Sequence, residues 1–173
     1  ASNQLKISGE ILVDIYAGKI SKWSDPKIAE MNPGVKLPNT AIAPVYRADG
    51  SGTTFVYTSY LSAVSPAWKE KTGAATSVKW PAGVAGKGNE GVAANIQRVK
   101  GSFGYVEYAY AKQNKLSYAM MSNKDGVFVA PSDDAFKAAA AGADWKGAPG
   151  MGVILTEQPG KASWPITGAS FIL

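Results

Sequence analysis

The stretch AIAPVYRADGSGTTFVYTSYLSAV, residues 41–64, joins a β-like run to a helical run through a short polar loop. Its first seven residues predict a strand, in which Pro44 indicates an edge position or a strand start. The residues after the loop predict a helix, because apolar side chains recur there at helical spacing. These side chains are Phe55, Val56, Leu61 and Val64, with the aromatic Tyr60 among them. The stretch therefore predicts a strand, a polar loop and a helix in that order.

Helical and β-like segments alternate along the rest of the chain in the same way. The predicted helices are residues 8–19, 25–34, 92–100, 109–114 and 133–145, and the predicted strands are residues 102–108, 116–122 and 162–173. Ser8 and Ser132 are candidate N-caps, because a serine hydroxyl accepts from the free N–H groups of a first helical turn. This alternation predicts a single α/β domain over residues 1–173, with a mixed, mostly parallel central sheet flanked by helices.

The composition excludes several classes of function. The 173 residues, 46% hydrophobic and 18% charged, are those of a globular protein. Cysteine and histidine are absent, which excludes thiolate and histidine metal sites and a Ser-His-Asp triad, and we expect neither a metal nor a cofactor. The net charge of +5 comes from scattered lysines, which does not favour nucleic acid as a partner. The N-terminal ASNQLKISGE has no apolar signal-peptide core, and no apolar run approaches a membrane span.

Three glycines in GKGNEG have the G-x-G-x-x-G spacing of dinucleotide-binding loops. They are Gly86, Gly88 and Gly91. That motif requires a buried strand immediately before the glycines, and the preceding VKWPAGVA is interrupted by proline and glycine. The pattern therefore favours a flexible loop that caps a helix at Asn89 over a dinucleotide site. Lys87 in this loop is a candidate cleft residue that faces an anion.

Arg47 and the residues after it combine several hydrogen-bond donors. Arg47 is one of only two arginines in the chain, and its planar fork suits tetrahedral oxyanions. A helix that begins near Ser51 would direct free backbone N–H groups and the positive end of its dipole toward one point. Those N–H groups belong to Gly52, Thr53 and Thr54, and the side chains of Ser51 and Thr53 add hydroxyl donors. The pattern predicts an anion site at the start of this helix.

Asp49 is open to two interpretations. Residues two apart in an extended segment point the same way, so its carboxylate is placed to brace Arg47 and to aim the guanidinium. In the alternative, Asp49 and Ser51 form an Asx-turn and a helix N-cap, which is the ordinary behaviour of such residues. The residues alone support the anion site and the capped turn equally.

Four stretches of the chain carry a resemblance to a known family. They are IYAGKISKWSDPKIAEMNPGVKLP, YRADGSGTTFVYTSYL, GKGNEGVAANIQRVKGSFGYVEYAYAKQN and WPITGASFIL, in that order. With them the chain resembles the periplasmic phosphate-binding proteins of high-affinity phosphate ABC transporters, from about residue 5 to residue 173. In that family the motif R-A-D-G-S-G-T, which begins here at Arg47, supplies phosphate ligands.

The resemblance assigns roles to the residues of this motif. It implies that Arg47 is the guanidinium donor and that Ser51 gives its hydroxyl and its backbone N–H. Gly52 and Thr53 would give backbone or hydroxyl donors, and Asp49 would orient the arginine. The implied ligand is inorganic phosphate, the implied location is the periplasm, and the implied partner of the whole protein is a membrane permease.

Members of that family fold as two lobes that hold phosphate in the cleft between them. The resemblance implies that residues 1–173 form the second, inserted lobe and that the first lobe is absent, which leaves half a site. We therefore expect phosphate binding at millimolar strength or weaker, with poor discrimination against sulfate. The missing first lobe would be the natural partner. A homodimer through residues 1–8 and 169–173 is a further hypothesis, because exposed strand edges invite pairing.

The leading hypothesis is thus a solute-binding module and not an enzyme. One alternative is an excised lobe with no independent function. The other is a phosphatase-like activity at the same loop, because some relatives of this family are described as phosphatases. The chain has no histidine, no carboxylate cluster for metals and no strong base beside Ser51 to support such chemistry.

Overall fold

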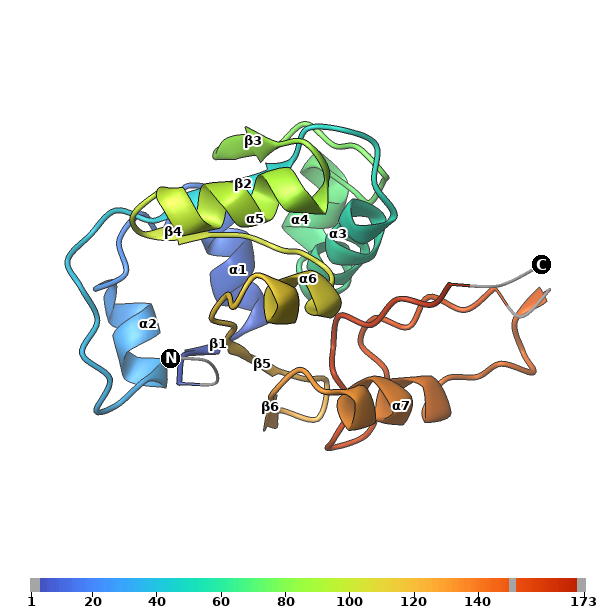
Figure 1. Ribbon diagram of the computed structural model, residues 1–173. Helices are drawn as coiled ribbons and strands as arrows, with labels where there is room; N and C mark the ends of the chain where they lie inside the picture. The colour runs from blue at the N-terminus through green and yellow to red at the C-terminus, as the bar shows by residue number, and fades with distance from the viewer. Residues whose placement is uncertain (1–3, 150–151, 171–173) are drawn as a thin grey trace.

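The computed structural model describes residues 4–149 and 152–170, and its strands form two small sheets (Figure 1). The strands are β1 (Lys6–Ile7), β2 (Ala43–Arg47), β3 (Val84–Gly86), β4 (Ser102–Phe103), β5 (Met120–Ser122) and β6 (Phe128–Val129). One sheet has the order β1-β5-β6 and the other β3-β2-β4, and among these described pairs only β5 with β6 is antiparallel. The predicted α/β class and mostly parallel pairing are confirmed, but the strands are divided between two sheets instead of one central sheet.

Five of the seven described helices begin at a residue whose side chain caps the first turn. The helices are α1 (Gly9–Tyr16), α2 (Pro26–Met31), α3 (Gly52–Val64), α4 (Pro66–Lys71), α5 (Gly88–Arg98), α6 (Tyr108–Gln113) and α7 (Asp133–Ala141). Of these, α5 and α6 begin without such a cap. The predicted N-caps Ser8 and Ser132 are confirmed, because the side chains accept from the backbone N–H groups of Ile11 and Ala135. Within the described ranges, no helix is both long enough and apolar enough to cross a membrane.

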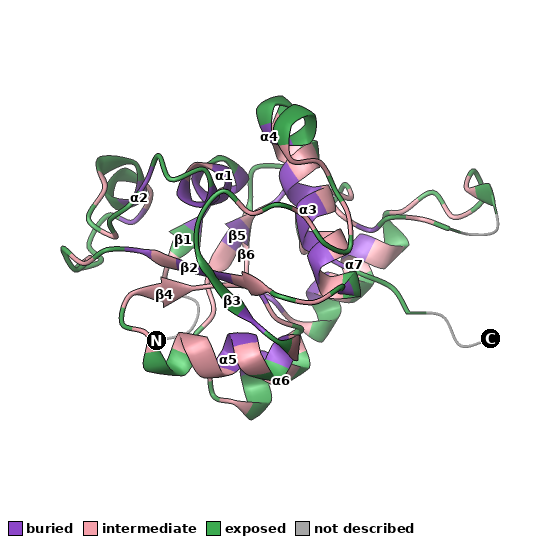
Figure 2. Ribbon diagram, turned by 90° about the horizontal axis from the view of Figure 1, so that it is seen from above, coloured by how far each residue is buried: buried purple, intermediate pink, exposed green. Residues whose placement is uncertain are grey.

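The core lies between α1, α3 and the sheets, and Figure 2 shows buried residues along both helices. Tyr16 of α1 is fully buried, and its hydroxyl donates to the Val45 carbonyl in β2 over 3.1 Å. Its ring packs edge-on against Tyr57 of α3 and in a tilted arrangement against Trp80, which precedes β3. This aromatic cluster fixes the positions of β2 and α3, the two elements that flank the polar loop.

Pro44 does not mark an edge strand, because β2 is the central strand between β3 and β4. The expected edge position is therefore wrong, whereas the expected strand start is confirmed. Successive N–H groups of a strand point to opposite sides. Ala43 donates to the Gly101 carbonyl on the β4 side, so the donor that Pro44 lacks would face the β3 side. The pairing of β2 with β3 starts only at Val45 and Val84, so Pro44 removes no hydrogen bond between these two strands.

The buried face of α3 agrees with the predicted apolar face only at Tyr60 and Leu61. The buried residues are Thr54, Tyr57, Thr58, Tyr60 and Leu61. Phe55, Val56 and Val64 are only partly buried. The threonines can be buried because they are hydrogen-bonded: the Thr58 hydroxyl donates to the Thr54 carbonyl over 2.8 Å. The large tyrosine rings, rather than the smaller aliphatic residues, thus decide which face turns inward.

Three predicted strands are shorter or weaker than expected. The strand predicted over 102–108 ends after Phe103, since at Gly104 the chain packs directly against β2: an added Cβ would lie 3.1 Å from the Val45 carbonyl oxygen. The strand predicted over 116–122 is reduced to β5. The stretch 162–173 shows only the bridge of Ile166 with Thr156, and its last three residues lie outside the described residues.

Candidate functional site

The carboxyl ends of β2 and β3 meet at one edge of the parallel sheet. Arg47, the last residue of β2, is in register with Gly86, the last residue of β3, and the Ala48 N–H donates to the Gly86 carbonyl over 2.9 Å. Helices α3 and α5 begin within five residues of these positions, so two helix N-termini lie at the same edge (Figure 1). In α/β sheets this edge is where ligands bind.

The guanidinium of Arg47 is held at all three of its nitrogens. Nε and Nη2 donate to the two carboxylate oxygens of Asp49 over 2.9 and 2.7 Å, and Nη1 donates to Oδ1 of Asn89 over 3.2 Å. The Arg47 side chain is 11% exposed and that of Asp49 36%. The expected bracing of Arg47 by Asp49 is therefore present as a two-pronged ion pair.

Electrostatics favour the charged form of both partners. Hydrogen bonding to Asp49 raises the pKa of the Arg47 guanidinium. The pKa of the Asp49 carboxyl lies far below its usual value, because Arg47 and the Gly88 N–H, which donates over 3.0 Å, both stabilise the carboxylate. The ion pair is thus fully charged across the neutral range, and Asp49 links the start of α5 to the arginine.

The capped turn and the polar cluster coexist at the start of α3. Ser51 is the N-cap of α3: its Oγ accepts from the Thr54 N–H over 3.1 Å. The Ser51 N–H donates to the Thr76 carbonyl over 2.9 Å. The expectation that the N–H groups of Ser51 and Thr54 point to an anion therefore does not hold in this structure, because both are already bonded.

The N–H groups that have no acceptor in the structure belong to residues that are close to one another in the sequence. Within the described ranges, no residue accepts from the N–H groups of Gly52 and Thr53, which are the first two of the helix. A guanidinium has five N–H groups, and Arg47 uses three of them in the bonds to Asp49 and Asn89. Two guanidinium N–H groups and two helix N–H groups are thus left for a ligand.

The glycine-rich stretch before α5 is not the flexible loop that the sequence predicts. It contains β3, and α5 begins at Gly88 with Lys87 as its N-cap residue, so Asn89 does not cap the helix. The glycines permit close packing: a Cβ at Gly86 would lie 2.7 Å from backbone atoms of Gly91 and Val92. The glycine spacing therefore serves strand–helix packing, and the Gly88 N–H is committed to Asp49.

Two contacts of the site were not predicted from the sequence. Asn89 is bonded to Arg47, although the sequence indicated only a capping role for it. The Tyr105 hydroxyl, just after β4, accepts from the backbone N–H of Arg47 over 3.2 Å. Both partners lie more than 40 positions along the chain from Arg47. A parallel β2–β4 register would have pointed to Tyr105, had the strand order been known.

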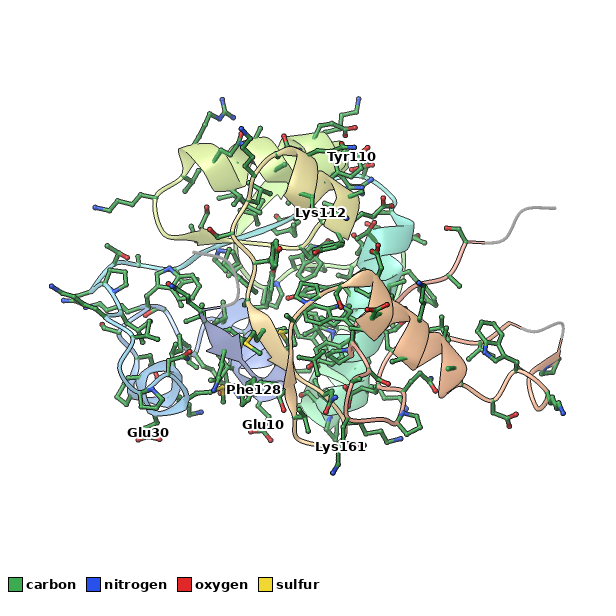
Figure 3. The ribbon with its side chains drawn as sticks, turned by 60° about the horizontal axis from the view of Figure 1, so that its bottom comes forward. Glu10, Glu30, Tyr110, Lys112, Phe128 and Lys161 are labelled. Atoms are coloured by element: carbon green, nitrogen blue, oxygen red, sulfur yellow. The ribbon has the colours of Figure 1, made fainter. Side chains whose placement is uncertain are left out.

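The side of the site next to α5 carries Lys87 and further polar residues. Lys87 is exposed and directly follows Gly86, the register partner of Arg47, so the structure brings it to the same edge. Tyr110 of α6 donates to Glu90 of α5 over 3.0 Å, and Figure 3 labels this tyrosine at the edge of the molecule. A role of Lys87 toward an anion stays a prediction. Among the described residues, no group of three or more acidic side chains is placed to hold a metal ion.

An α/β domain that presents free donors at the carboxyl ends of parallel strands has the arrangement of a ligand-binding domain. The chain belongs to the PBP superfamily, whose domain matches residues 1–165. Residue by residue, it is 61% identical to the phosphate-binding protein PstS of Pasteurella multocida, over 99% of this chain and 50% of that protein. It is 54% identical to the PstS proteins of Xylella fastidiosa (98% of this chain, 47% of that protein) and of Haemophilus influenzae (98% and 51%). The chain thus spans about half the length of these relatives.

Solved structures show the same fold. A high affinity periplasmic phosphate-binding protein bound with phosphate superimposes with a TM-score of 0.61 and 23% identity, over 83% of this chain and 41% of that one. A human phosphate binding apolipoprotein superimposes with a TM-score of 0.56 and 21% identity, over 82% and 41%. At these identities the likeness establishes the architecture and does not by itself assign a ligand.

Proposed function

We propose that this chain forms one half of a binding site for inorganic phosphate in a solute-binding protein that serves a phosphate ABC transporter. The proposal rests on the Arg47 guanidinium, which is fixed by hydrogen bonds and precedes the start of α3. Free N–H groups remain both on this guanidinium and in the first turn of α3. These donors suit a tetrahedral oxyanion. The relatives that are 54–61% identical carry the name phosphate-binding protein.

The second half of the site would come from residues outside this chain. Relatives are about twice as long, and a first lobe would supply further donors and close over the anion. The four donors here give charge-assisted bonds worth roughly 1.5 to 3 kcal/mol each before desolvation and screening are subtracted. Because a millimolar constant needs only about 4 kcal/mol, the isolated chain is expected to bind phosphate at millimolar strength or weaker. The acceptor for a phosphate proton would also belong to the first lobe, so the isolated chain is expected to discriminate poorly against sulfate.

The setting of the whole protein follows from the same proposal. A solute-binding protein of an ABC transporter works in the periplasm and delivers its ligand to a membrane permease. Association of two copies through residues 1–8 and 169–173 stays a prediction, because residues 1–3 and 171–173 lie outside the described residues. Light scattering over a wide concentration range tests it: a constant monomer mass would contradict it.

Binding is proposed rather than phosphate transfer. Ser51 is 5% exposed, and its Oγ accepts from the Thr54 N–H, an arrangement that stabilises the helix and does not activate a nucleophile. The chain is therefore expected not to release nitrophenol from nitrophenyl phosphate. Release that is lost in Ser51→Ala would contradict this part of the proposal.

A titration of the isolated chain with inorganic phosphate, followed by NMR, tests the site. The amide signals of Gly52 and Thr53 and the guanidinium Nη–H signals of Arg47 should shift together, with one dissociation constant. Arg47→Ala should abolish the shifts, and Arg47→Lys should weaken binding, since lysine keeps the charge but lacks the fork.

The matched control is Arg98→Ala, which removes the other arginine. Arg98 is exposed at the end of α5, and within the described ranges its side chain donates only to Asn95 Oδ1, over 3.4 Å. Its loss should leave the phosphate titration unchanged. Shifts that persist in Arg47→Ala, or that occur away from the start of α3, would show that the site is misplaced.

A further inference from the structure

Asn89 is an uncharged residue at the most highly charged point of the site. It is the second residue of α5 and is 9% exposed. Its Oδ1 accepts from Nη1 of Arg47 over 3.2 Å, the one guanidinium nitrogen that Asp49 does not bond. Without this bond the arginine would be fixed on one edge only. Asn89 therefore adds a second anchor to the guanidinium, at the one nitrogen that Asp49 does not hold.

The lack of charge on Asn89 matters as much as the position of the residue. Arg47 and Asp49 form a pair with no net charge, so attraction for an anion rests on the remaining donors and the dipole of α3. A third acceptor that carried a charge would leave a net negative centre beside the ligand. An asparagine fixes Arg47 without adding that charge, and its Nδ2 has no acceptor within the described ranges.

If the residue at position 89 served stability alone, a negatively charged side chain would be favoured there. Lys87 is the N-cap residue, and Asn89 follows in the first turn, where a carboxylate interacts favourably with the helix dipole. Aspartate has nearly the same shape as asparagine and would bond Arg47 more strongly. For stability alone, aspartate would therefore be as good or better, so substitution separates the two roles.

We propose that Asn89 is a positioning and specificity residue of the oxyanion site, which fixes the third nitrogen of Arg47 while keeping the site free of a second negative charge. This inference rests on the proposed function. Its consequence is a preference for the more highly charged form of a tetrahedral oxyanion. A second carboxylate would repel a dianion more than a monoanion of the same shape.

The groups around Arg47 allow a clean pH comparison. The titratable side chains that act on it are Asp49, Glu90 and Tyr105. The pKa values of both carboxyls are lowered, and burial raises the pKa of the Tyr105 hydroxyl. Tyr110 donates to Glu90, and Lys87 is an exposed cation at the same edge. Between about pH 5.5 and about pH 8, the change in phosphate binding therefore reports the ionisation of phosphate itself.

The test is the affinity of Asn89→Asp for phosphate at about pH 5.5 and about pH 8, at constant ionic strength, followed at the Gly52 and Thr53 amides. We expect binding to weaken about tenfold at the higher pH, where phosphate is mainly a dianion, and about threefold at the lower pH. Sulfate, which stays a dianion, should show the larger loss at both. The free energy of unfolding should be unchanged or higher.

Two further variants separate the loss of the hydrogen-bond acceptor from the effect of an added negative charge. Asn89→Ala removes the acceptor without adding charge, and should weaken binding about two- to fivefold and equally at both pH values. Gln97→Glu adds the same charge to the exposed part of α5 and should leave binding within about twofold, because salt screens distant surface charges.

The outcomes distinguish this inference from the proposed function. If Gly52 and Thr53 do not respond to phosphate in the unmodified chain, the proposed function fails and the inference fails with it. If they respond, but Asn89→Asp binds as well as the unmodified chain or loses affinity equally at both pH values, only the inference is overturned. The Asn89→Ala result decides the positioning role even where the aspartate variant does not fold.

Discussion

The Tyr105 hydroxyl lies 2.7 Å from the Thr54 hydroxyl oxygen, which joins the segment after β4 to the first turn of α3. The same hydroxyl accepts from the Arg47 N–H over 3.2 Å, and the ring stacks on Tyr57 with centroids 4.4 Å apart. One buried side chain thus sets the distance between the arginine and the helix whose free N–H groups lie beside it.

Tyr105→Phe should reduce the free energy of unfolding by about 1 to 2 kcal/mol, because the Arg47 N–H and the Thr54 hydroxyl each lose a partner in a buried place. Urea unfolding measures the change. Tyr46→Phe is the control: Tyr46 stacks on Trp80, but its hydroxyl has no partner among the described residues. Equal losses in the two variants would show that the Tyr105 hydroxyl contributes nothing.

Ser51→Ala tests whether the N-cap also serves the ligand. Loss of the cap should lower the free energy of unfolding by about 1 kcal/mol. The proton of the Ser51 hydroxyl has no acceptor among the described residues and is available to a ligand, so its loss should also weaken phosphate binding. Ser132→Ala removes the equivalent cap of α7 and should cost about the same stability without any effect on binding. Weaker phosphate binding in Ser51→Ala but not in Ser132→Ala would show that Ser51 also serves the ligand. Unchanged binding in Ser51→Ala would show that Ser51 acts only as a cap.

Gly86→Ala should destabilise the chain by about 1 to 3 kcal/mol, because the new methyl group would meet the backbone of α5, which cannot move aside cheaply. Gly52→Ala is the matched variant, since a Cβ there would meet no atom within 4 Å. Alanine in the first turn of α3 should leave stability unchanged or raise it by up to about 1 kcal/mol. Thermal unfolding of both variants gives the comparison, and similar melting temperatures would contradict the packing role of Gly86.

Glu157 should make stability depend on pH in the direction opposite to Asp49. Its Oε1 is buried with no described partner, its φ is +55°, and burial raises its pKa above 4.5. The folded chain therefore binds this proton more tightly than the unfolded chain, and the resulting stability is present below pH 4.5 and is lost as the pH rises through the raised value.

The variant Glu157→Gln cannot lose that proton. The difference in free energy of unfolding between Glu157→Gln and the unmodified chain should therefore grow in favour of the variant from about pH 4 to about pH 7. Urea unfolding across this range measures it, and the subtraction removes the contribution of carboxyls such as Asp49. A difference that stays constant with pH would contradict the shifted pKa.

Local chemistry explains which elements were predictable. Ser8 and Ser132 cap their helices through neighbours three residues away, and such a signal is contained in a short stretch of sequence. Arg47 and Asp49 are likewise two positions apart, so their spacing indicated the ion pair as one of two interpretations, and the structure contains it. The start of α3 next to them was predicted for the same reason.

Long-range pairing explains what the sequence did not reveal. Strand β3 has three residues, and Val84 and Ala85 are exposed, so it has no apolar pattern and becomes a strand only by pairing with β2. Asn89 and Tyr105 meet Arg47 only because β3 and β4 flank β2. The buried face of α3 was likewise set by its own tyrosine rings, such as Tyr57, which packs against Tyr16 and Tyr105, and not by its aliphatic periodicity.

The span of the hydrogen bonds around Arg47 has a consequence for how the chain folds. Apart from the local pair with Asp49, the bonds from Asn89, Gly88 and Tyr105 join residues 39 to 58 positions apart. Loops of that length close late, after local helices have formed. The ability to hold an anion should therefore be acquired in the last kinetic step of refolding, which makes the site a reporter of completed topology rather than of helix content.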